Sequence, residues 1–297
     1  MAATNRKLLI IRNPVSGRGN QKRFDKVLAL LKKSGASVSV RTTEYAGHGT
    51  QLVKQVLDSG EDWSAIVGAG GDGTIAELAN AMVDTEIPLG IIPMGTANIL
   101  AREIGIGTKL KKIVAVLVSA KPELIYPGLL EQKRFLLMVS AGYDSLAVAE
   151  LRLEEKRKFG AFAYVIAAFR ASKQFGSLDL SVKANGEIYK GASIIVSRSR
   201  LFGGFFVVAP KADLRKLEFH VLVLKNKGLW AAIRYGFSLL SGRLSTCRSV
   251  DYIQTNGPVE LLSQEGVPCQ MDGDDGPLTP QIIRLDERPI KILAAYK

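Results

Sequence analysis

Three short polar loops near the beginning of this chain carry the residue types that bind phosphate groups. The most informative loop runs from Gly70 to Thr74, between an apolar segment at 64–67 and a segment with helical spacing at 75–82. Glycines in such a turn let phosphate oxygens approach bare backbone, and the following helix offers its unpaired N–H groups. The Asp72 carboxylate repels phosphate, so it fits either an intervening Mg²⁺ ion or a proton taken from a hydroxyl. The alternative is a plain tight turn, for which Asp-Gly is a common dipeptide.

The other two loops have similar compositions and also follow apolar segments. Their residues of interest are Asn13, Pro14, Ser16, Gly17, Gly95, Thr96 and Asn98. Pro14 stops strand pairing, and Ser16 can offer donors to an anion. Gly95 frees the backbone, while Thr96 or Asn98 can cap the next helix or reach a nucleotide. Each loop alone resembles an ordinary helix cap, but three loops at one sheet edge favour a nucleotide-phosphate site.

The segments around these loops alternate between strand and helix patterns. Strands are predicted at 7–12, 38–42, 64–67 and 88–92, and helices at 23–33, 50–57, 75–82 and from 97 onward. Such alternation predicts a parallel sheet with helices on both faces. Ligands of such sheets bind beyond the carboxyl ends of the strands, which is where the three loops lie.

The pattern changes between residues 121 and 128. Short β-type segments follow at 134–140, 178–184, 194–196, 218–224 and 259–262, and helical segments at 146–172 and 229–239. Asn185-Gly186 predicts a tight hairpin between two of the strands. We therefore expect an α/β nucleotide-binding domain at 1–127, a mostly antiparallel β domain at 128–285, and a tail at 286–297 that can return to the first domain. The active site is expected in the cleft between the two domains.

The net charge of +12 is concentrated in residues 151–251, which hold 18 Lys/Arg and 7 Asp/Glu. The region opens with Lys156, Arg157 and Lys158 and continues through Arg198 to Lys216. A solvated face explains such a run, and an anionic membrane or a nucleic acid would bind it. Without an RNA-binding aromatic signature or a zinc finger, membrane contact is the better functional interpretation and no nucleic-acid partner is expected.

The composition excludes several other sites. The two cysteines and two histidines do not have the spacing of a zinc site or a histidine-based triad. The start of the chain has no secretory pattern, and no apolar run approaches the roughly 20 residues of a membrane span. We therefore expect a cytoplasmic protein, with peripheral attachment to membranes.

At these motifs the chain resembles the diacylglycerol kinase catalytic-domain family, lipid kinases that include bacterial diacylglycerol kinases and the sphingosine and ceramide kinases. The resemblance covers nearly the whole chain, through segments at 13–17, 43–48, 70–74, 95–98, 141–144, 202–210 and 271–274. It implies a first domain like that of phosphofructokinase and NAD kinase. It also implies ATP- and Mg²⁺-dependent transfer of the γ-phosphoryl group to a lipid hydroxyl, within lipid metabolism and phospholipid biosynthesis.

The resemblance also implies roles for individual residues. The ATP-binding set is Asn13, Pro14, Ser16, Gly17, Thr43, Gly70, Gly71, Asp72, Gly73, Thr74, Gly95, Thr96 and Asn98. Asp72 resembles the carboxylate that organises Mg²⁺ near the phosphates. Asp272-Gly273-Asp274 resembles the family's Asp-Gly-Glu, so Asp274 or Asp272 is expected to activate the acceptor hydroxyl. A simple turn is the alternative for this segment, and Asp274-Asp275-Gly276 is also turn-like.

The chain departs from the family pattern at two places. Ile99 stands where many bacterial members have Asp, which removes one acidic group. The segment 211–216 lacks the Asp-Gly pair that often binds a structural Mg²⁺ after the Ala-Pro motif. We predict that this second metal site is missing and that Lys216 or Arg215 supplies the charge instead.

The lipid-binding residues and the nature of the acceptor stay open. The aromatic segment 159–169 serves either a lipid pocket or core packing, and Phe202, Phe205 and Phe206 raise the same question. A relative of NAD kinase or phosphofructokinase would share the Gly-Gly-Asp-Gly loop but use a soluble acceptor. A non-catalytic lipid or nucleotide sensor would keep the fold without turnover.

Overall fold

The computed structural model describes residues 5–17, 21–82, 84–142, 180–262 and 266–296. The chain divides into two compact units, unit 1 with residues 1–125 and 288–297, and unit 2 with residues 126–287. The helix predicted at 146–172 lies outside the described residues, together with its aromatic segment 159–169 and the basic cluster 156–158.

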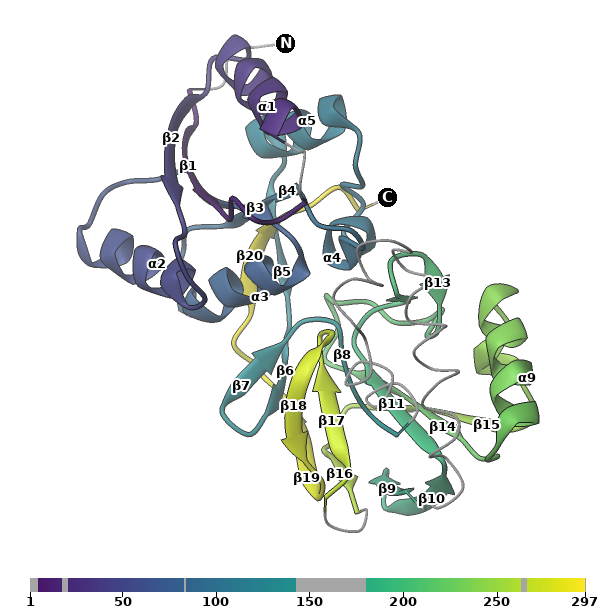
Figure 1. Cartoon of the computed structure of the whole chain (residues 1–297). Coiled ribbons are helices and arrows are strands. Elements are labelled where there is room, and N and C mark those ends of the chain that lie inside the picture. The colour runs from purple at the N-terminus through teal and green to yellow at the C-terminus, as the bar shows by residue number, and fades with distance from the viewer. Residues whose placement is uncertain (1–4, 18–20, 83, 143–179, 263–265, 297) are drawn as a thin grey trace. The chain divides into compact units, whose positions relative to one another are not determined.

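Unit 1 is built on a six-stranded sheet in the order β2-β1-β3-β4-β20-β5 (Figure 1). Its strands are β1 (Lys7–Arg12), β2 (Ser37–Thr42), β3 (Ala65–Gly70), β4 (Leu89–Pro93), β5 (Pro122–Ile125) and β20 (Ile290–Leu293). All neighbours are parallel except β20 and β5. Strands β3 and β4 are buried along their whole length, as central strands of a covered parallel sheet are. The predicted parallel α/β fold is confirmed.

The helices of unit 1 are α1 (Gln21–Lys33), α2 (His48–Asp58), α3 (Asp72–Ala81), α4 (Ile99–Glu103) and α5 (Leu110–Ser119). Helix α3 begins at Asp72, three residues before the predicted start at residue 75. The segment 70–74, predicted as a loop, therefore consists of the last residue of β3, the connecting residue Gly71 and the first turn of α3. An acidic residue in a first turn interacts favourably with the positive end of the helix dipole.

Unit 2 contains two six-stranded antiparallel sheets. The first has the order β10-β9-β16-β19-β6-β7, with β6 (Gly128–Leu130), β7 (Lys133–Phe135), β9 (Leu180–Ala184), β10 (Glu187–Gly191), β16 (Val259–Leu261) and β19 (Gln281–Leu285). The second has the order β15-β14-β11-β8-β17-β18, with β8 (Met138–Ala141), β11 (Ser193–Ser197), β14 (Phe219–Leu224), β15 (Val250–Thr255), β17 (Pro268–Met271) and β18 (Asp274–Leu278). The mostly antiparallel second domain is confirmed.

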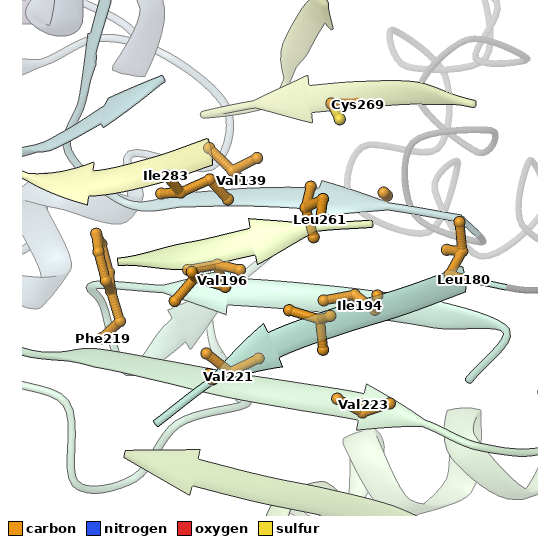
Figure 2. Packing of buried hydrophobic residues seen from close by; sticks show 14 of the residues in the cluster. Val139, Leu180, Ile194, Val196, Phe219, Val221, Val223, Leu261, Cys269 and Ile283 are labelled. Atoms are coloured by element: carbon orange, nitrogen blue, oxygen red, sulfur yellow. The ribbon is translucent and has the colours of Figure 1, made fainter. Parts of the chain in front are cut away.

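The two sheets of unit 2 enclose one apolar core (Figure 2). Val182, Leu261 and Ile283 enter it from the first sheet, and Val196 and Val221 from the second. Successive residues of a strand face opposite sides of a sheet, so the remaining apolar positions of the second sheet belong to a different cluster.

That second cluster lies against α9 (Leu229–Leu240), the short helix η2 (Leu244–Thr246) and the hairpin of β12 (Leu201–Phe202) and β13 (Phe206–Val207). Leu222 and Leu224 of β14 belong to this cluster, whereas Val221 and Val223 face the core between the sheets. Among the helices that the structure describes, none combines the length and the apolar character that a membrane crossing requires.

In unit 2 the structure confirms one predicted hairpin and shows that one predicted strand was wrong. Asn185 and Gly186 have φ of 53° and 83° and join β9 to β10, as the Asn-Gly dipeptide predicts. The single strand predicted at 134–140 is instead two strands, β7 and β8, which belong to different sheets. The residues between them bond to Asp272, a distant partner that local patterning does not reveal.

Candidate functional site

The loops that follow β3 and β4 lie backbone against backbone. The N–H of Met94 donates to the carbonyl of Gly70 at 2.8 Å. A Cβ added to Gly95 would lie 2.7 Å from the Cα of Gly71, so a side chain at position 95 would force the loops apart. Glycine at this position is thus required by the close approach of two loops, which the sequence predicted to share one edge of the sheet.

Asn13 joins the loop after β1 to the same site. Its backbone N–H donates to the carbonyl of Ala69 at 3.0 Å, and its Nδ2 donates to Oγ1 of Thr74 at 3.0 Å. Its Oδ1 accepts the N–H of Val15 at 3.1 Å and so shapes its own loop. Asn13 therefore acts within the protein, by fixing the first loop to the start of α3.

Most of the other predicted nucleotide-binding residues also gather at this edge of the sheet. Gly70 ends β3, Gly71 precedes α3, and Gly73 is exposed in the first turn of that helix. Pro14 and Thr96 are exposed, while Ser16 and Gly17 are half-buried. Thr43 follows β2, where its N–H donates to the carbonyl of Arg12 at 2.8 Å.

The N-terminus of α3 is the best candidate for a phosphate site in this group. Its N-cap residue is Gly71, which makes no side-chain capping bond. A helix start leaves several N–H groups without partners inside the helix, and these attract anions. The glycine backbones at 70, 71, 73 and 95 leave room for phosphate oxygens to approach, so the residues present fit a nucleotide phosphate.

Asp72 links two helices. It is the first residue of α3, and its Oδ1 accepts the N–H of Leu100, near the start of α4, at 3.1 Å. Burial raises the pKa of this carboxyl, and the N–H groups of residues 98–100 act in the opposite direction. The carboxylate thus caps α4.

Asn98 has a different function from the helix cap predicted for it. Its side chain makes no capping bond to α4. Its Oδ1 accepts the N–H of Gly95 at 2.8 Å, and its Nδ2 donates to the carbonyl of Gly95 at 2.7 Å. With φ of 47°, Asn98 closes its own loop, and Asp72 supplies the cap.

Glu77 is a positioning residue that sequence reasoning missed. Its Oε1 accepts the N–H of Thr50 in the first turn of α2 at 3.1 Å. Helix α2 has Gly47 as its N-cap residue and no side-chain cap of its own. Because glycine at the N-cap position has no side chain to cap the helix, it indicates that a residue from another element can supply the cap. Helix α3 thereby holds α2 through Glu77 and α4 through Asp72.

In unit 2, Asp272 and Gly273 form the turn of the β17–β18 hairpin, with φ of 53° and 91°. The Asp272 carboxylate accepts the N–H groups of Leu136, Leu137 and Met138 at 2.7, 2.8 and 2.9 Å. The N–H of Asp272 donates in turn to the carbonyl of Met138 at 2.9 Å. A carboxylate engaged by three N–H groups is a poor proton acceptor, so its geometry is that of a structural clamp.

Asp274 has the opposite surroundings. It is the first residue of β18, directly after the turn, and its side chain is exposed. The segment 274–276, which looked turn-like in the sequence, belongs to this strand, so that expectation was wrong. Of the two acidic residues predicted to activate a hydroxyl, only Asp274 presents its carboxylate to solvent.

In the basic segment after Ala209-Pro210, the carboxylate of Asp213 is paired with a cation of the same segment. Arg215 bonds Asp213 through Nε at 2.9 Å and Nη2 at 2.8 Å, and this bonding lowers the pKa of the Asp213 carboxyl. Lys216 instead lies 3.7 Å from Glu218. Within the described residues, no three His, Cys, Asp or Glu side chains cluster as metal ligands would. The missing second metal site stays a prediction, with Arg215 as the cation paired to Asp213.

Comparisons with known proteins agree over both units. The family pattern described as "Diacylglycerol kinase catalytic domain" matches residues 7–128, and that described as "YegS C-terminal NAD kinase beta sandwich-like domain" matches residues 137–294. A diacylglycerol kinase of Staphylococcus carnosus (strain TM300) is 27% identical over 277 residues, which cover 91% of this chain and 89% of that protein. A diacylglycerol kinase of Bacillus subtilis (strain 168) is 26% identical, with 91% and 90% covered.

A solved structure shares the fold. The crystal structure of a diacylglycerol kinase from Bacillus anthracis (strain Sterne) has a TM-score of 0.73 and 18% sequence identity. The match covers 98% of this chain and 97% of that one. At this identity the likeness concerns the fold.

Proposed function

Because this chain belongs to the diacylglycerol kinase family, we propose that it is a lipid kinase that transfers the γ-phosphoryl group of ATP to a lipid hydroxyl. The observation that carries the proposal is the division of tasks among its carboxylates. Asp272 is engaged by three N–H groups, whereas Asp274, two residues later, is exposed. The hairpin thus holds Asp272 in the turn and presents the Asp274 carboxylate to solvent.

The ATP phosphates are proposed to bind at the start of α3. The N–H groups at 71–74 and the exposed Thr96 would contact phosphate oxygens, and the glycines would let them approach. Phosphoryl transfer depends mainly on positioning and on neutralising charge, which fits a site made of backbone donors. Asn13 and Asp72 hold the three loops in place.

Mg²⁺ would be held by Asp72 together with phosphate oxygens and water. One or two carboxylates are the usual protein share of such a site, so the single carboxylate of Asp72 fits it. The ion, when bound, neutralises phosphate charge. Because Asp72 is the first residue of α3, its carboxylate would also help to orient the N–H donors at the start of that helix.

Asp274 is proposed to accept the proton of the acceptor hydroxyl. A general base needs a carboxylate with a free lone pair near the reacting hydroxyl, and the exposed Asp274 meets the first condition. Asp272 positions it, since the bonds from residues 136–138 fix the turn just before it. Asp274 is shorter than the family's Glu by one methylene but keeps the proton-accepting group.

A lipid acceptor implies work at a membrane surface. The net charge of +12 favours peripheral contact with an anionic bilayer, where a lipid with a free hydroxyl resides. Diacylglycerol, a sphingoid base and ceramide all present such a hydroxyl.

The proposal is tested with a panel of these lipids in mixed micelles, γ-labelled ATP and Mg²⁺, with products identified by mass. NAD is included as a soluble acceptor. We expect a lipid phosphomonoester from one lipid class and no phosphorylated NAD. Phosphorylation of NAD alone, or ATP consumption without any phosphorylated lipid, would contradict the proposal.

The base is tested by Asp274→Asn with Asp275→Asn as its matched control. Both residues are exposed neighbours on β18, so the two variants alter charge and stability in the same way. We expect Asp274→Asn to lower kcat by about 100-fold or more, the usual contribution of a general base, and Asp275→Asn to stay within a few-fold. Equal activity of the two variants would remove Asp274 from the reaction.

A further inference from the structure

Helix α9 has apolar side chains on two opposite faces. The inner face packs on the second apolar cluster of unit 2 through Ala231 and Tyr235, which are both about 5% exposed, and the half-buried Leu239. The Tyr235 hydroxyl accepts the N–H of Asn226 at 2.9 Å and donates to the carbonyl of Ser249 at 3.0 Å. The helix is therefore held in one orientation, with its other face outward.

The outward face carries four large apolar side chains. Trp230 is 83% exposed, Phe237 68%, Leu240 64% and Ile233 36%. Their spacings of three, four and three residues place them in one stripe along the helix, about 15 Å long at 1.5 Å per residue. Figure 1 shows α9 at the margin of unit 2, and α9 also contacts β13, beside the 59% exposed Phe205.

Such a stripe does not serve the fold. Single exposed apolar residues are normal, but an aligned row of them is typical of an interaction surface. The inner face already anchors α9, so four apolar side chains in water add nothing to its packing.

Basic residues lie close to the stripe in the sequence. Residues 226–250 include no Asp or Glu and four basic residues, Lys227, Arg234, Arg243 and Arg248, all exposed. Arg234 lies on the helix itself, one turn after Trp230. Lys225, just before this segment, is paired with Asp251 at 2.8 Å. The segment that carries the apolar stripe is thus also positively charged.

We propose that α9 docks unit 2 on an anionic lipid bilayer, with Trp230, Phe237 and Leu240 in the acyl boundary and the four cations at the headgroups. An amphipathic helix with Trp, Phe and Leu on one side and Lys or Arg beside them is typical of the membrane interface. The tryptophan ring also suits the headgroup level. This assignment deepens the membrane contact in the proposed function by naming the element responsible for it.

Charge favours the bilayer over a second copy of this chain. In a symmetric dimer the same surface patch would meet itself, which would bring the four cations of each copy against those of the other. Anionic headgroups instead attract these cations, which is worth about a fivefold gain in affinity for each cation near the surface.

The first test compares binding to vesicles of equal parts phosphatidylglycerol and phosphatidylcholine by flotation. The variant Trp230→Ala/Phe237→Ala should bind at least tenfold more weakly than the unaltered chain. The matched control is Ile188→Ala/Ile282→Ala, which removes two exposed apolar side chains, 58% and 43% exposed, from the other sheet. This control should bind normally. Equal binding by the stripe variant and the unaltered chain would overturn the assignment.

Fluorescence gives a readout that requires no loss of binding. The chain has two tryptophans, Trp230 and Trp63, and the latter is 7% exposed. In Trp63→Phe, emission from Trp230 should shift to the blue on adding these vesicles and be quenched by lipids brominated in their acyl chains. Unshifted emission with vesicle-bound protein would place the contact elsewhere and overturn the assignment.

Two further experiments test whether the basic residues contribute to binding and whether a second copy of the chain, rather than a bilayer, covers the stripe. Arg234→Gln/Arg243→Gln should weaken binding to these vesicles by more than tenfold at low salt, and pure phosphatidylcholine vesicles should bind poorly. A dimer that depends on Trp230 and Phe237, measured by sedimentation without lipid, would overturn the bilayer assignment. With lipid acceptor in detergent micelles, the stripe variant should keep the activity of the unaltered chain, so a failed kinase assay is not mistaken for failed docking.

Discussion

The same dipeptide, Asp-Gly, occurs in both units of the molecule, yet the two copies have different structures. In unit 1, Asp72-Gly73 opens helix α3, and the Asp72 carboxylate accepts the N–H of Leu100. In unit 2, Asp272-Gly273 is a left-handed hairpin turn, and the Asp272 carboxylate accepts three N–H groups. The comparison shows that one dipeptide gives its carboxylate two structural settings, a helix start in unit 1 and a hairpin turn in unit 2.

The two carboxylates also differ in what their bonds support. Asp72 ties the start of α4 to the start of α3 and so sets the width of the glycine-lined space between them. Asp272 closes a turn on the segment between β7 and β8, and presents the next acid, Asp274, to solvent. One carboxylate is part of the proposed site, and the other supports the residue that is.

The largest expected effect is on catalysis in Asp72→Asn. The amide oxygen still accepts the N–H of Leu100, so α4 keeps its cap, but the negative charge is lost. We expect kcat to fall by about 1,000-fold, within the range that charge-stabilising groups contribute, with no loss of thermal stability. Steady-state kinetics and a melting curve measure the two quantities. Near-normal activity would reduce Asp72 to a helix cap.

The next largest effect is on folding in Asp272→Ala. Three N–H groups lose their acceptor, and a lost bond of this kind costs about 1 kcal/mol or more, so we expect a loss of about 3 kcal/mol in the free energy of unfolding. Urea unfolding measures it. Asp272→Asn keeps an oxygen in place of Oδ1, which accepts two of the three bonds, and should recover most of the loss. A loss below 1 kcal/mol in Asp272→Ala would contradict the clamp.

Both halves of this comparison were visible in the sequence only in part. Strand and helix periods and turn dipeptides are local, so they predicted the parallel sheet, the β domain and the Asn185-Gly186 hairpin. The capping of α4 joins residues 28 positions apart, and the Asp272 clamp joins residues 134 to 136 positions apart. Such partners depend on the folded chain, so the sequence could suggest the acids but could not distinguish a clamp from a base.

Helix α9 shows the same limit on a surface. Its spacing predicted a helix at 229–239, close to the observed Leu229–Leu240. Because apolar residues lie on two faces of α9, the pattern could not say which face packs inward. Only the packing of Ala231 and Tyr235 on unit 2 identifies the face with Trp230 and Phe237 as exposed.

A smaller effect is expected on the free energy of unfolding when Gly73 or Gly273 is replaced by alanine, and the two replacements should have opposite signs. Gly73 lies in a helix and is exposed, where alanine should stabilise the protein by about 0.5 kcal/mol. Gly273 has φ of 91°, a conformation that alanine adopts at a cost of about 1 kcal/mol or more. Urea unfolding of Gly73→Ala and Gly273→Ala measures both changes. Changes of the same sign would mean that the two Asp-Gly pairs are less different than the backbone shows.

The smallest effect is the pH dependence of stability that Asp72 confers. Burial raises the pKa of its carboxyl above the value of 3.8 for an unperturbed aspartate, so the folded protein binds the proton more tightly than the unfolded chain. The stability linked to this proton is complete below about pH 3.8 and is lost as pH rises through the folded-state pKa. Asp72→Asn does not titrate at this position.

The difference in unfolding free energy between Asp72→Asn and the unaltered chain should therefore shift in favour of the variant as pH rises from about 3.5 to 7. Because the side chain is half-buried and its charge is partly screened by solvent, we expect this shift to be the smallest effect of the series. Urea unfolding of both proteins at several pH values measures it. A shift in the opposite direction would mean that the N–H groups of residues 98–100 outweigh burial, which would make Asp72 a clamp like Asp272.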